Sequence, residues 1–553
     1  MIPAPHPAAA SVSRVILSSV LCLLLGFLTA CGDRRSSAER AAEQGLLLLG
    51  NNTEPQSLDP HKATAVADGK IISTLLEGLV RPDAQDSAVC HPGMAESWEC
   101  SDDATVWTFH LRRACWSDGS PVRAQDFAYA YRRMLHPEFG GRYAEMLDPL
   151  KGARAYTRGE RPWEAVGVST PDDCTLVLTL EGPTPHLLRL LLHFTWYPLP
   201  EAWVEAHGGM LDRRSVWTKP GCWVGNGAYV LAEHRINDYV SVLPNPRYWR
   251  AGEVRNRGIR FLPIVNGYTE TRMYFGGKLH ITNNVPPEMI RYAAARAPHE
   301  FCQDDYYCTI FYRLNTARKP LNDPRVRRAL ALAVDRAALV ERVVRGAGAP
   351  ATAFTPFAEV ELPEGAPATK AAREAEAQRL LAEAGYPGGE GFPTLELMTT
   401  SRDVQRVMGE CIQAMWAEVL GVHVELRACE WTAFKVAQQN GEYDMASNSW
   451  SGDYLDPATF LELWQTDGGN NNTAWSCKAY DVDLAAVRRC ADDSQRAALF
   501  RRLEEKLAEE QPIIPLYWSR RTYLKYPTVQ GWSPLLLDNH PLDAVEVHPL
   551  GKS

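Results

Sequence analysis

Residues 394–426 read TLELMTTSRDVQRVMGECIQAMWAEVLGVHVEL, two short apolar runs on either side of a long amphipathic segment. Thr394–Met398 and Val422–Leu426 are typical of strands, whereas 402–420 carries apolar residues at helical spacing and ends at Gly421. Strand, helix and strand in this order form a βαβ unit. Because such a unit requires parallel strands and a right-handed crossover, the sequence predicts an α/β domain.

The same mixture of elements continues on both sides of this unit. Asp323 and Pro324 form a helix start, with a capping side chain followed by a proline that already has helical geometry. Further strands are predicted at 105–111, 175–180 and 239–243. Helices are predicted at 126–135, at 325–334, in a second segment after 334 that ends at about Arg345, and at 370–384.

Length and composition restrict the class of protein. A chain of 553 residues exceeds one hydrophobic core, so two or three domains are expected. Hydrophobic residues make up 45% and charged residues 23%, which is typical of soluble globular proteins and excludes a disordered or multi-span membrane protein. The formal charge of −9 disfavours binding to a nucleic-acid backbone, so no nucleic-acid partner is expected.

The amino-terminal residues 1–31 have the pattern of an export signal, with Arg14 followed by an apolar stretch over 15–30. The end, Leu28-Thr-Ala-Cys-Gly32, resembles a bacterial lipoprotein signal, which implies cleavage before Cys31 and a lipid on that cysteine. The alternative is an ordinary secretory signal with a chance cysteine. Residues 32–45 are interpreted as a polar tether. The protein is thus expected to be exported and lipid-anchored at a bacterial membrane, facing the periplasm or cell exterior.

Eleven cysteines remain beyond the signal, an odd number that leaves at least one thiol unpaired. An exported protein is permitted disulfides, but the sequence leaves their connectivity open. No C-x-x-C, H-E-x-x-H, G-x-S-x-G or Walker-type motif occurs, and the histidines are scattered. We therefore expect no enzyme activity, no metal site and no cofactor, which argues against an exported peptidase.

Several motifs occur in the order typical of one family and together cover nearly all of residues 46–550. The chain resembles the periplasmic oligopeptide-binding proteins, which are extracellular solute-binding proteins of family 5. The matching motifs are Gln56-Ser-Leu-Asp-Pro-His61, Glu77-Gly-Leu79, Gly93–Trp98, Trp107–Arg112, Trp116–Ser120, Gly225–Tyr229, Asn245–Trp249, Leu321–Arg327, Ala329–Ala333, Leu380–Gly385 and Pro512–Tyr517.

The resemblance implies an α/β, two-lobed periplasmic-binding-protein fold (type II, cluster C-like) with an extra third domain and the ligand in the interlobe cleft. Domain I would comprise 45–66, 206–307 and 520–553, domain II 67–205, and domain III 308–519. Closure would be a hinge motion around the bound ligand.

It also implies a function. The protein would bind oligopeptides by pairing with their backbone as an added strand. It would then deliver them to the permease and ATPase of an ABC importer, acting as a monomer. Two alternatives stay open: a specialised ligand (a dipeptide, a cell-wall peptide, haem or a nickel chelate) and a role as a peptide sensor.

The family places the partner of the ligand's α-ammonium in a W-x-x-D-Y element, here Trp450-Ser-Gly-Asp453-Tyr454. Asp453 is therefore the predicted anchor, Trp450 a pocket wall, and Ser449 and Ser451 sources of backbone bonds. On the residues alone, Trp450 as core and Asp453 as a turn cap is the alternative.

Further ligand contacts follow from the resemblance. Glu54 matches the opposite wall, Tyr143 and Trp431 match aromatic lining residues, and Asn471 to Thr473 match a polar loop. Basic residues that hold peptide carboxyl termini are replaced by Ser447 and Val404, which leaves Arg345, Arg402 and Arg406 as candidates for that role.

Three departures from the family pattern bear on the ligand. Pro55 lacks a strand N–H donor, and Ser519 widens one pocket. Cys308 matches a family cysteine whose expected partner is Ser451 here, so that disulfide is in doubt and Cys302 is the alternative partner.

Overall fold

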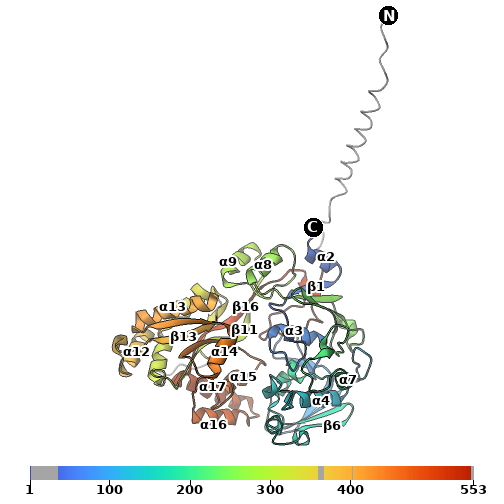
Figure 1. The fold of residues 1–553 in the computed structure, drawn as a ribbon, viewed down its shortest axis with the longest axis horizontal. Helices are drawn as coiled ribbons and strands as arrows, with labels where there is room; N and C mark the ends of the chain where they lie inside the picture. The colour runs from blue at the N-terminus through green and yellow to red at the C-terminus, as the bar shows by residue number, and fades with distance from the viewer. Residues whose placement is uncertain (2–34, 359–366, 401–402, 550–553) are drawn as a thin grey trace.

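The computed structural model describes residues 1, 35–358, 367–400 and 403–549. Nearly all of the predicted signal, including Cys31, and the candidate ligand residue Arg402 lie outside the described residues. Two bodies stand side by side in Figure 1, one around α12, α13 and β13 and the other around α3, α4 and α7.

The second of these bodies contains two four-stranded sheets. The first sheet has the order β1-β10-β9-β8, with β1 parallel to β10, and the second has the antiparallel order β4-β5-β7-β6. Their strands are β1 (Leu46–Gly50), β8 (Tyr229–Arg235), β9 (Tyr239–Pro244), β10 (Gly258–Leu262), β4 (Ala95–Cys100), β5 (Val106–Leu111), β6 (Val168–Asp172) and β7 (Thr175–Thr179).

The first body contains a six-stranded mixed sheet of order β12-β16-β11-β15-β13-β14. The predicted βαβ unit is confirmed: β13 (Leu395–Thr400), α13 (Asp403–Leu420) and β14 (Val424–Cys429) follow one another, and β13 pairs with β14 in parallel. The other strands are β11 (Phe301–Leu314), β12 (Gly348–Pro350), β15 (Met445–Ser451) and β16 (Ile513–Leu524).

Helices cover these sheets. The predicted helix start at Asp323 is confirmed, because its side chain accepts a hydrogen bond from Arg325 N at the beginning of α10. The helices are α2 (Ser37–Glu43), α3 (Val66–Leu75), α4 (Ala124–Leu135), α5 (Ala153–Thr157), α6 (Leu187–Leu190), α7 (Glu201–Ala206), α8 (Gly267–Phe275), α9 (Pro287–Arg296), α10 (Pro324–Leu332), α11 (Arg336–Leu339), α12 (Lys370–Glu383), α14 (Trp431–Gln439), α15 (Ala458–Leu461), α16 (Lys478–Val487) and α17 (Asp493–Glu510). Two-stranded pairs are formed by β2 (Val80–Pro82) with β3 (Cys90–Pro92) and by β17 (Val529–Gln530) with β18 (Glu546–Val547).

Two long strands connect the bodies. β11 and β16 pair in antiparallel register from Phe301–Leu524 to Arg313–Ile513, with irregularities between Asp305 and Thr309 and after Ile310. Figure 1 shows both strands between the two bodies. Both strands run across the domain boundaries that the sequence predicts near residues 307 and 519. Those domain boundaries stay a prediction.

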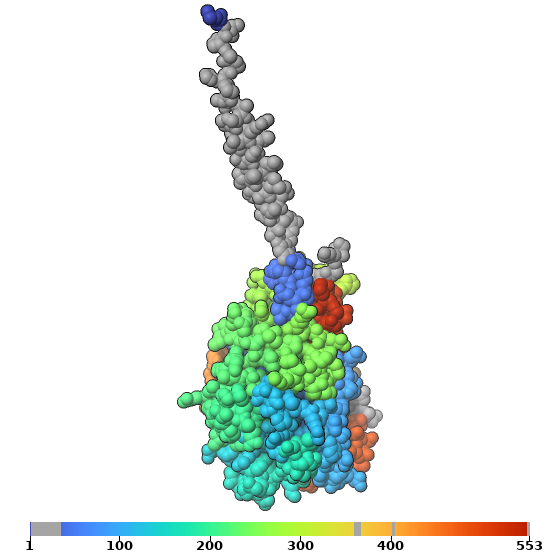
Figure 2. Space-filling model, turned by 90° about the vertical axis from the view of Figure 1, so that its right-hand side faces the viewer, coloured from blue at the N-terminus to red at the C-terminus, as the bar shows by residue number. Residues whose placement is uncertain are grey.

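Residues 36–43 correct the interpretation of 32–45 as a tether. They form α2, whose Ser36 and Glu39 make a capping box and whose Ala38, Ala41 and Ala42 are buried. Ala38 N donates to Gly277 O, and Ala38 O lies 2.8 Å from the ring of His280. Ala38 thus contacts His280, which lies 242 positions later in the chain, and local composition does not predict this contact. In Figure 2, α2 (blue) lies at the same end of the molecule as residues near the carboxyl end of the chain (red).

Within the described part of the chain, none of the helices combines the length and the apolar character needed to cross a membrane.

Candidate functional site

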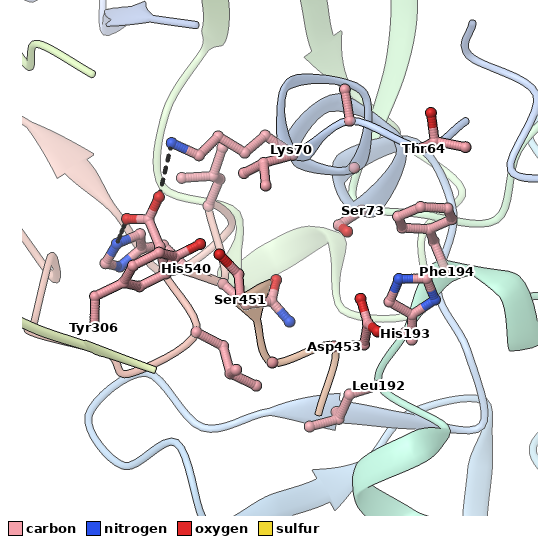
Figure 3. Close-up of a pocket in the computed structure, with 18 of the residues that line it drawn as sticks. Thr64, Lys70, Ser73, Leu192, His193, Phe194, Tyr306, Ser451, Asp453 and His540 are labelled. Carbon is pink, nitrogen blue, oxygen red and sulfur yellow. Dashed lines mark hydrogen bonds and ion pairs between the residues drawn. The ribbon is translucent and has the colours of Figure 1, made fainter. Parts of the chain in front are cut away.

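A cavity lies where the two bodies meet. Its volume is about 150 Å³, less than the usual 300–1,000 Å³ of a small-molecule pocket. Its walls come from α3, from Tyr143, from residues 192–194, from Tyr306 of β11, from the end of β15, and from the segment 532–542 near the carboxyl end. Figure 3 shows side chains of these segments pointing toward one space.

Asp453 provides a carboxylate in this cavity. It lies two residues after the end of β15, and its backbone N–H donates to Thr459 Oγ1 at 3.2 Å, which fixes the turn into α15. Among the described residues, no hydrogen bond or ion pair reaches the carboxylate itself. Burial raises its pKa from the usual 3.8 to about 7, and the charge of Glu145 adds to the shift. No cation among the described residues is therefore paired with this group.

Uncharged aromatic side chains line the cavity beside Asp453 (Figure 3). Tyr143 meets the ring of His193 edge-on, with ring centroids 5.3 Å apart, and both residues line the cavity together with Phe194. Burial lowers the pKa of His193 to about 3, so this imidazole is uncharged at neutral pH. The negative charge of Asp453 is thus left uncompensated by its nearest neighbours.

The segment that carries Asp453 is held from two sides. Tyr454 stacks on His186 at 5.5 Å, and Arg189 of α6 donates to Leu455 O at 3.0 Å. Asp456 forms a buried ion pair with Arg496 of α17 at 2.6 Å. These contacts fix the backbone on both sides of the turn, so the position of the carboxylate is preorganised.

The strand leading to Asp453 has an open edge. On one edge, Met445–Ser451 of β15 pairs with β11 along its full length. On the other edge, pairing with β13 is limited to Met445 and Ala446. No described strand covers residues 447–451 there, so their backbone groups are available to an extended ligand.

The structure brings Asp453, Ser451 and Tyr143 together in the cavity. Trp450 and Ser449 lie on the same strand, opposite Thr309 and Ile310 of β11. Ser449 is exposed, and Trp450 is half-buried with its indole N–H unpaired.

Neither Trp450 and Ser449 nor the remaining predicted residues of the described chain line this cavity. Glu54 accepts hydrogen bonds from His234 at 2.6 Å and from Asn237 N at 3.0 Å, which ties it to the hairpin β8–β9. Trp431 is 57% exposed at the start of α14, where it stacks on Phe434. Its role as a pocket wall stays a prediction.

The candidate loop and the candidate arginines also lie apart from the cavity. The amide of Asn471 donates to backbone carbonyls of its own loop, and Thr473 is fully buried and donates to Asn471 Oδ1, so both serve the loop. Arg406 pairs with Glu410 one helical turn away, and Arg345 is exposed with a left-handed backbone.

Several residues that line the cavity lie in no local sequence pattern that predicts a binding role. Trp532, Asp538 and His540 come from an irregular segment near the carboxyl end, and Lys70 comes from an ordinary amphipathic helix. They meet only through the tertiary fold, and sequence reasoning did not select them.

Cys308 and Ser451 are direct cross-strand neighbours on β11 and β15, and Cys308 is buried. All eleven cysteines of the described chain are free, including Cys302, and position 451 carries a serine. Paired positions of this kind bring their Cβ atoms within reach of a disulfide.

Ser451→Cys is expected to form a disulfide with Cys308 and to stabilise the protein by about 2–4 kcal/mol. Under oxidising conditions the free-thiol count falls by two relative to Ser449→Cys, which faces Ile310 instead. The melting temperature rises and returns to the Ser449→Cys value after reduction. An unchanged thiol count would contradict the expected geometry.

Among the described residues, no group of three or more His, Cys, Asp or Glu side chains is arranged to hold a metal ion.

Two α/β bodies joined by paired strands, with a partly charged cavity between them, define a two-lobed solute-binding protein. Residues 90–472 match the family described as "Bacterial extracellular solute-binding proteins, family 5 Middle". The chain belongs to this family, and it has the two-lobed periplasmic-binding fold with a third domain.

Known relatives match over nearly their full length. The periplasmic oligopeptide-binding protein of Escherichia coli K12 is 34% identical over 527 residues, covering 94% of this chain and 95% of the relative. The periplasmic murein peptide-binding protein of the same organism is 33% identical and covers 89% of this chain and 91% of its own. The crystal structure of Haemophilus influenzae OppA in complex with the peptide RPPGFSPFR is similar, with 31% identity, a TM-score of 0.80, and coverage of 91% of this chain and 99% of that one.

Proposed function

We propose that this protein binds oligopeptides in the cleft and delivers them to the permease of an ABC importer. The observation that carries the proposal is the uncompensated Asp453 carboxylate at the end of an open strand edge. A peptide presents both missing partners, since its α-ammonium matches the carboxylate and its extended backbone matches the edge of β15.

The relatives support a peptide as the ligand. The names of the two Escherichia coli relatives assign them oligopeptide binding and murein peptide binding, and the similar Haemophilus influenzae structure contains a nine-residue peptide. A binding protein needs no catalytic group, and the cavity offers a charge anchor and backbone contacts rather than a nucleophile with a base.

The amino terminus of the ligand provides the test. A tetrapeptide such as Ala-Gln-Ala-Ala is expected to lose roughly 30- to 5,000-fold in affinity when its amine is acetylated, because Asp453 is then left buried without its partner. Isothermal titration calorimetry with the mature protein, freed of copurified ligand by unfolding and refolding, gives both dissociation constants. Equal affinities for the free and acetylated peptides would contradict the proposal.

A cell-wall peptide is the second candidate, favoured by the similarity to the murein peptide-binding protein. Such a ligand also has a free amine, so it retains the need for Asp453. Competition between a murein tripeptide and Ala-Gln-Ala-Ala separates the two classes by the ratio of their affinities.

We further propose that Cys31 carries a lipid that anchors the exported protein to a membrane. The supporting observation is the Leu28–Gly32 motif after an apolar stretch. Cys31→Ala is expected to move the protein from the membrane fraction to the soluble fraction, whereas Cys22→Ala, inside the apolar stretch, leaves it in place. Retention of Cys31→Ala in the membrane fraction would contradict lipidation.

A further inference from the structure

A second charged cluster lies in the wall of the same cavity. Lys70 of α3 approaches Asp538 Oδ2 at 3.0 Å, and Arg521 of β16 approaches the same oxygen at 3.0 Å. His540 Nε2 lies 3.1 Å from the other carboxylate oxygen. Figure 3 shows Lys70, Tyr306 and His540 on one side of the space and Asp453 and His193 on the other, with Ser451 between them.

Asp538 lies within ion-pair distance of all three side chains, although its Oδ2 atom is buried without a hydrogen bond of good geometry. Burial opposes its ionisation, but Arg521 and Lys70 outweigh that effect and hold its pKa well below the usual value. Burial lowers the pKa of His540, which favours the neutral ring despite the neighbouring carboxylate. The cluster thus contains two cations that share one fully ionised carboxylate.

Two other carboxylates lie near the cluster without lining the cavity. Glu270 of α8 accepts hydrogen bonds from Asn283 N and Asn284 N, and Asp304 of β11 accepts one from Tyr523. Burial raises the pKa of both groups, that of Glu270 to about 7, which reduces their negative charge. Neither residue lines the cavity, whereas Lys70 does.

Lys70 keeps donor capacity toward the cavity. Its side chain is 10% exposed, and its ammonium contacts Asn283 Oδ1 at 3.3 Å and Asp538 at 3.0 Å. An ammonium has three N–H donors, so one has no partner among the described residues. Arg521 Nε is also buried without a hydrogen-bond partner. A buried cation with spare donors favours an anionic acceptor.

We propose that Lys70, supported by Arg521, forms a subsite for a carboxylate that the ligand carries close to its amino terminus. The preferred ligand is then a peptide with aspartate or glutamate as its first or second residue. This inference rests on the proposed function, because Asp453 holds the α-ammonium in the same cavity. A cavity of about 150 Å³ holds only the first residues of a peptide, so both charges belong to that end.

A carboxylate reaches this subsite from one of two sources. One is an acidic side chain, and the other is the carboxyl terminus of a dipeptide. Both place a carboxylate within one or two residues of the ammonium, so the probes must separate them.

The test uses calorimetry with four tetrapeptides: Ala-Glu-Ala-Ala, Ala-Gln-Ala-Ala, Glu-Ala-Ala-Ala and Gln-Ala-Ala-Ala. The dipeptide Ala-Ala and its carboxyl-terminal amide test the second source. For the wild-type protein we expect one glutamate peptide to bind roughly 10-fold or more tightly than its glutamine counterpart, since a charge-assisted hydrogen bond replaces a neutral one.

Lys70→Met removes the ammonium but keeps most of the apolar stem, and it is expected to abolish the preference for glutamate. The ratio of the affinities for the glutamate and glutamine peptides, rather than either affinity alone, is the readout. Lys70→Arg retains the charge and is expected to retain the preference. If Lys70→Met does not fold, the ratio of the wild-type affinities for the glutamate and glutamine peptides still tests the inference.

Equal wild-type affinities within both glutamate–glutamine pairs, together with equal affinities for Ala-Ala and its amide, would overturn the inference and leave the proposed function standing. The inference is also overturned if the preference persists in Lys70→Met. Failure of every peptide to bind would remove the proposed function and this inference with it. If free Ala-Ala binds more tightly than its amide in a Lys70-dependent way, the subsite is supported and the carboxylate is that of the carboxyl terminus.

Discussion

Asp453→Asn is expected to weaken the binding of a free-amine peptide by about 100-fold or more at pH 7.5. Asparagine has nearly the same shape as aspartate but no charge, so the α-ammonium of the ligand enters the cavity without a counter-ion. Because the turn is fixed by Thr459 and by the contacts of Tyr454 and Asp456, the fold is expected to persist.

The same substitution has the opposite effect on the empty protein. The folded pKa of Asp453 is about 7, above its usual 3.8, so its protonated form contributes stability that is complete below pH 3.8 and lost as pH rises through 7. Asparagine does not ionise. We therefore expect Asp453→Asn to be more stable than the wild type at pH 8, by at most about 4 kcal/mol, and similar to it at pH 4.

A matched control is Asp467→Asn, an exposed aspartate whose left-handed backbone suits asparagine. It is expected to change neither peptide affinity nor the pH dependence of melting. Calorimetric titration and thermal melting at pH 4 and pH 8 measure both effects. If Asp453→Asn binds as the wild type does, Asp453 is not the ammonium partner.

Sequence patterns were sufficient where structure depends on neighbouring residues. The βαβ unit, the cap at Asp323 and the helix over 370–384 follow from periodicity and helix-end chemistry, and the structure confirms them. Asp453 was selected by its spacing from Trp450 within a family motif, and the structure places it in the cavity.

Sequence patterns were insufficient where distant segments meet. Lys70 and Asp538 are 468 positions apart, and nothing local to either predicts an ion pair. The burial of Ala38 depends on contacts with Gly277 and His280. Conversely, Arg406 was predicted to bind the carboxyl terminus of the ligand, but it pairs with Glu410, which lies four positions later on the same helix face.

Peptide affinity is expected to depend on pH with a maximum between about 7 and 8. Below pH 7 the empty protein holds Asp453 in its protonated form, so binding of an ammonium must first release that proton. The affinity then falls by about tenfold for each pH unit down to 5. Above pH 8 the peptide amine itself loses its proton, since its usual pKa is about 7.7–8.0.

The other titratable groups facing Asp453 do not produce this loss of peptide affinity below pH 7. His193 has a pKa of about 3 and stays neutral, and burial raises the pKa of the Tyr143 hydroxyl, so it stays protonated. Glu145 also has a raised pKa, and its protonation at low pH lessens the charge repulsion at Asp453. Glu145→Gln is therefore expected to shift the decrease in peptide affinity to lower pH without removing it.

Calorimetry at pH 6 in two buffers of different ionisation enthalpy counts the protons exchanged. A group with a pKa of about 7 is nine-tenths protonated at pH 6, so binding is expected to release about 0.9 proton in the wild type. Asp453→Asn should release none, and its residual affinity should be flat between pH 5 and 7. A flat profile in the wild type would mean that Asp453 is already ionised in the empty cavity, and the anchor would then need a cation that binds it before the ligand does.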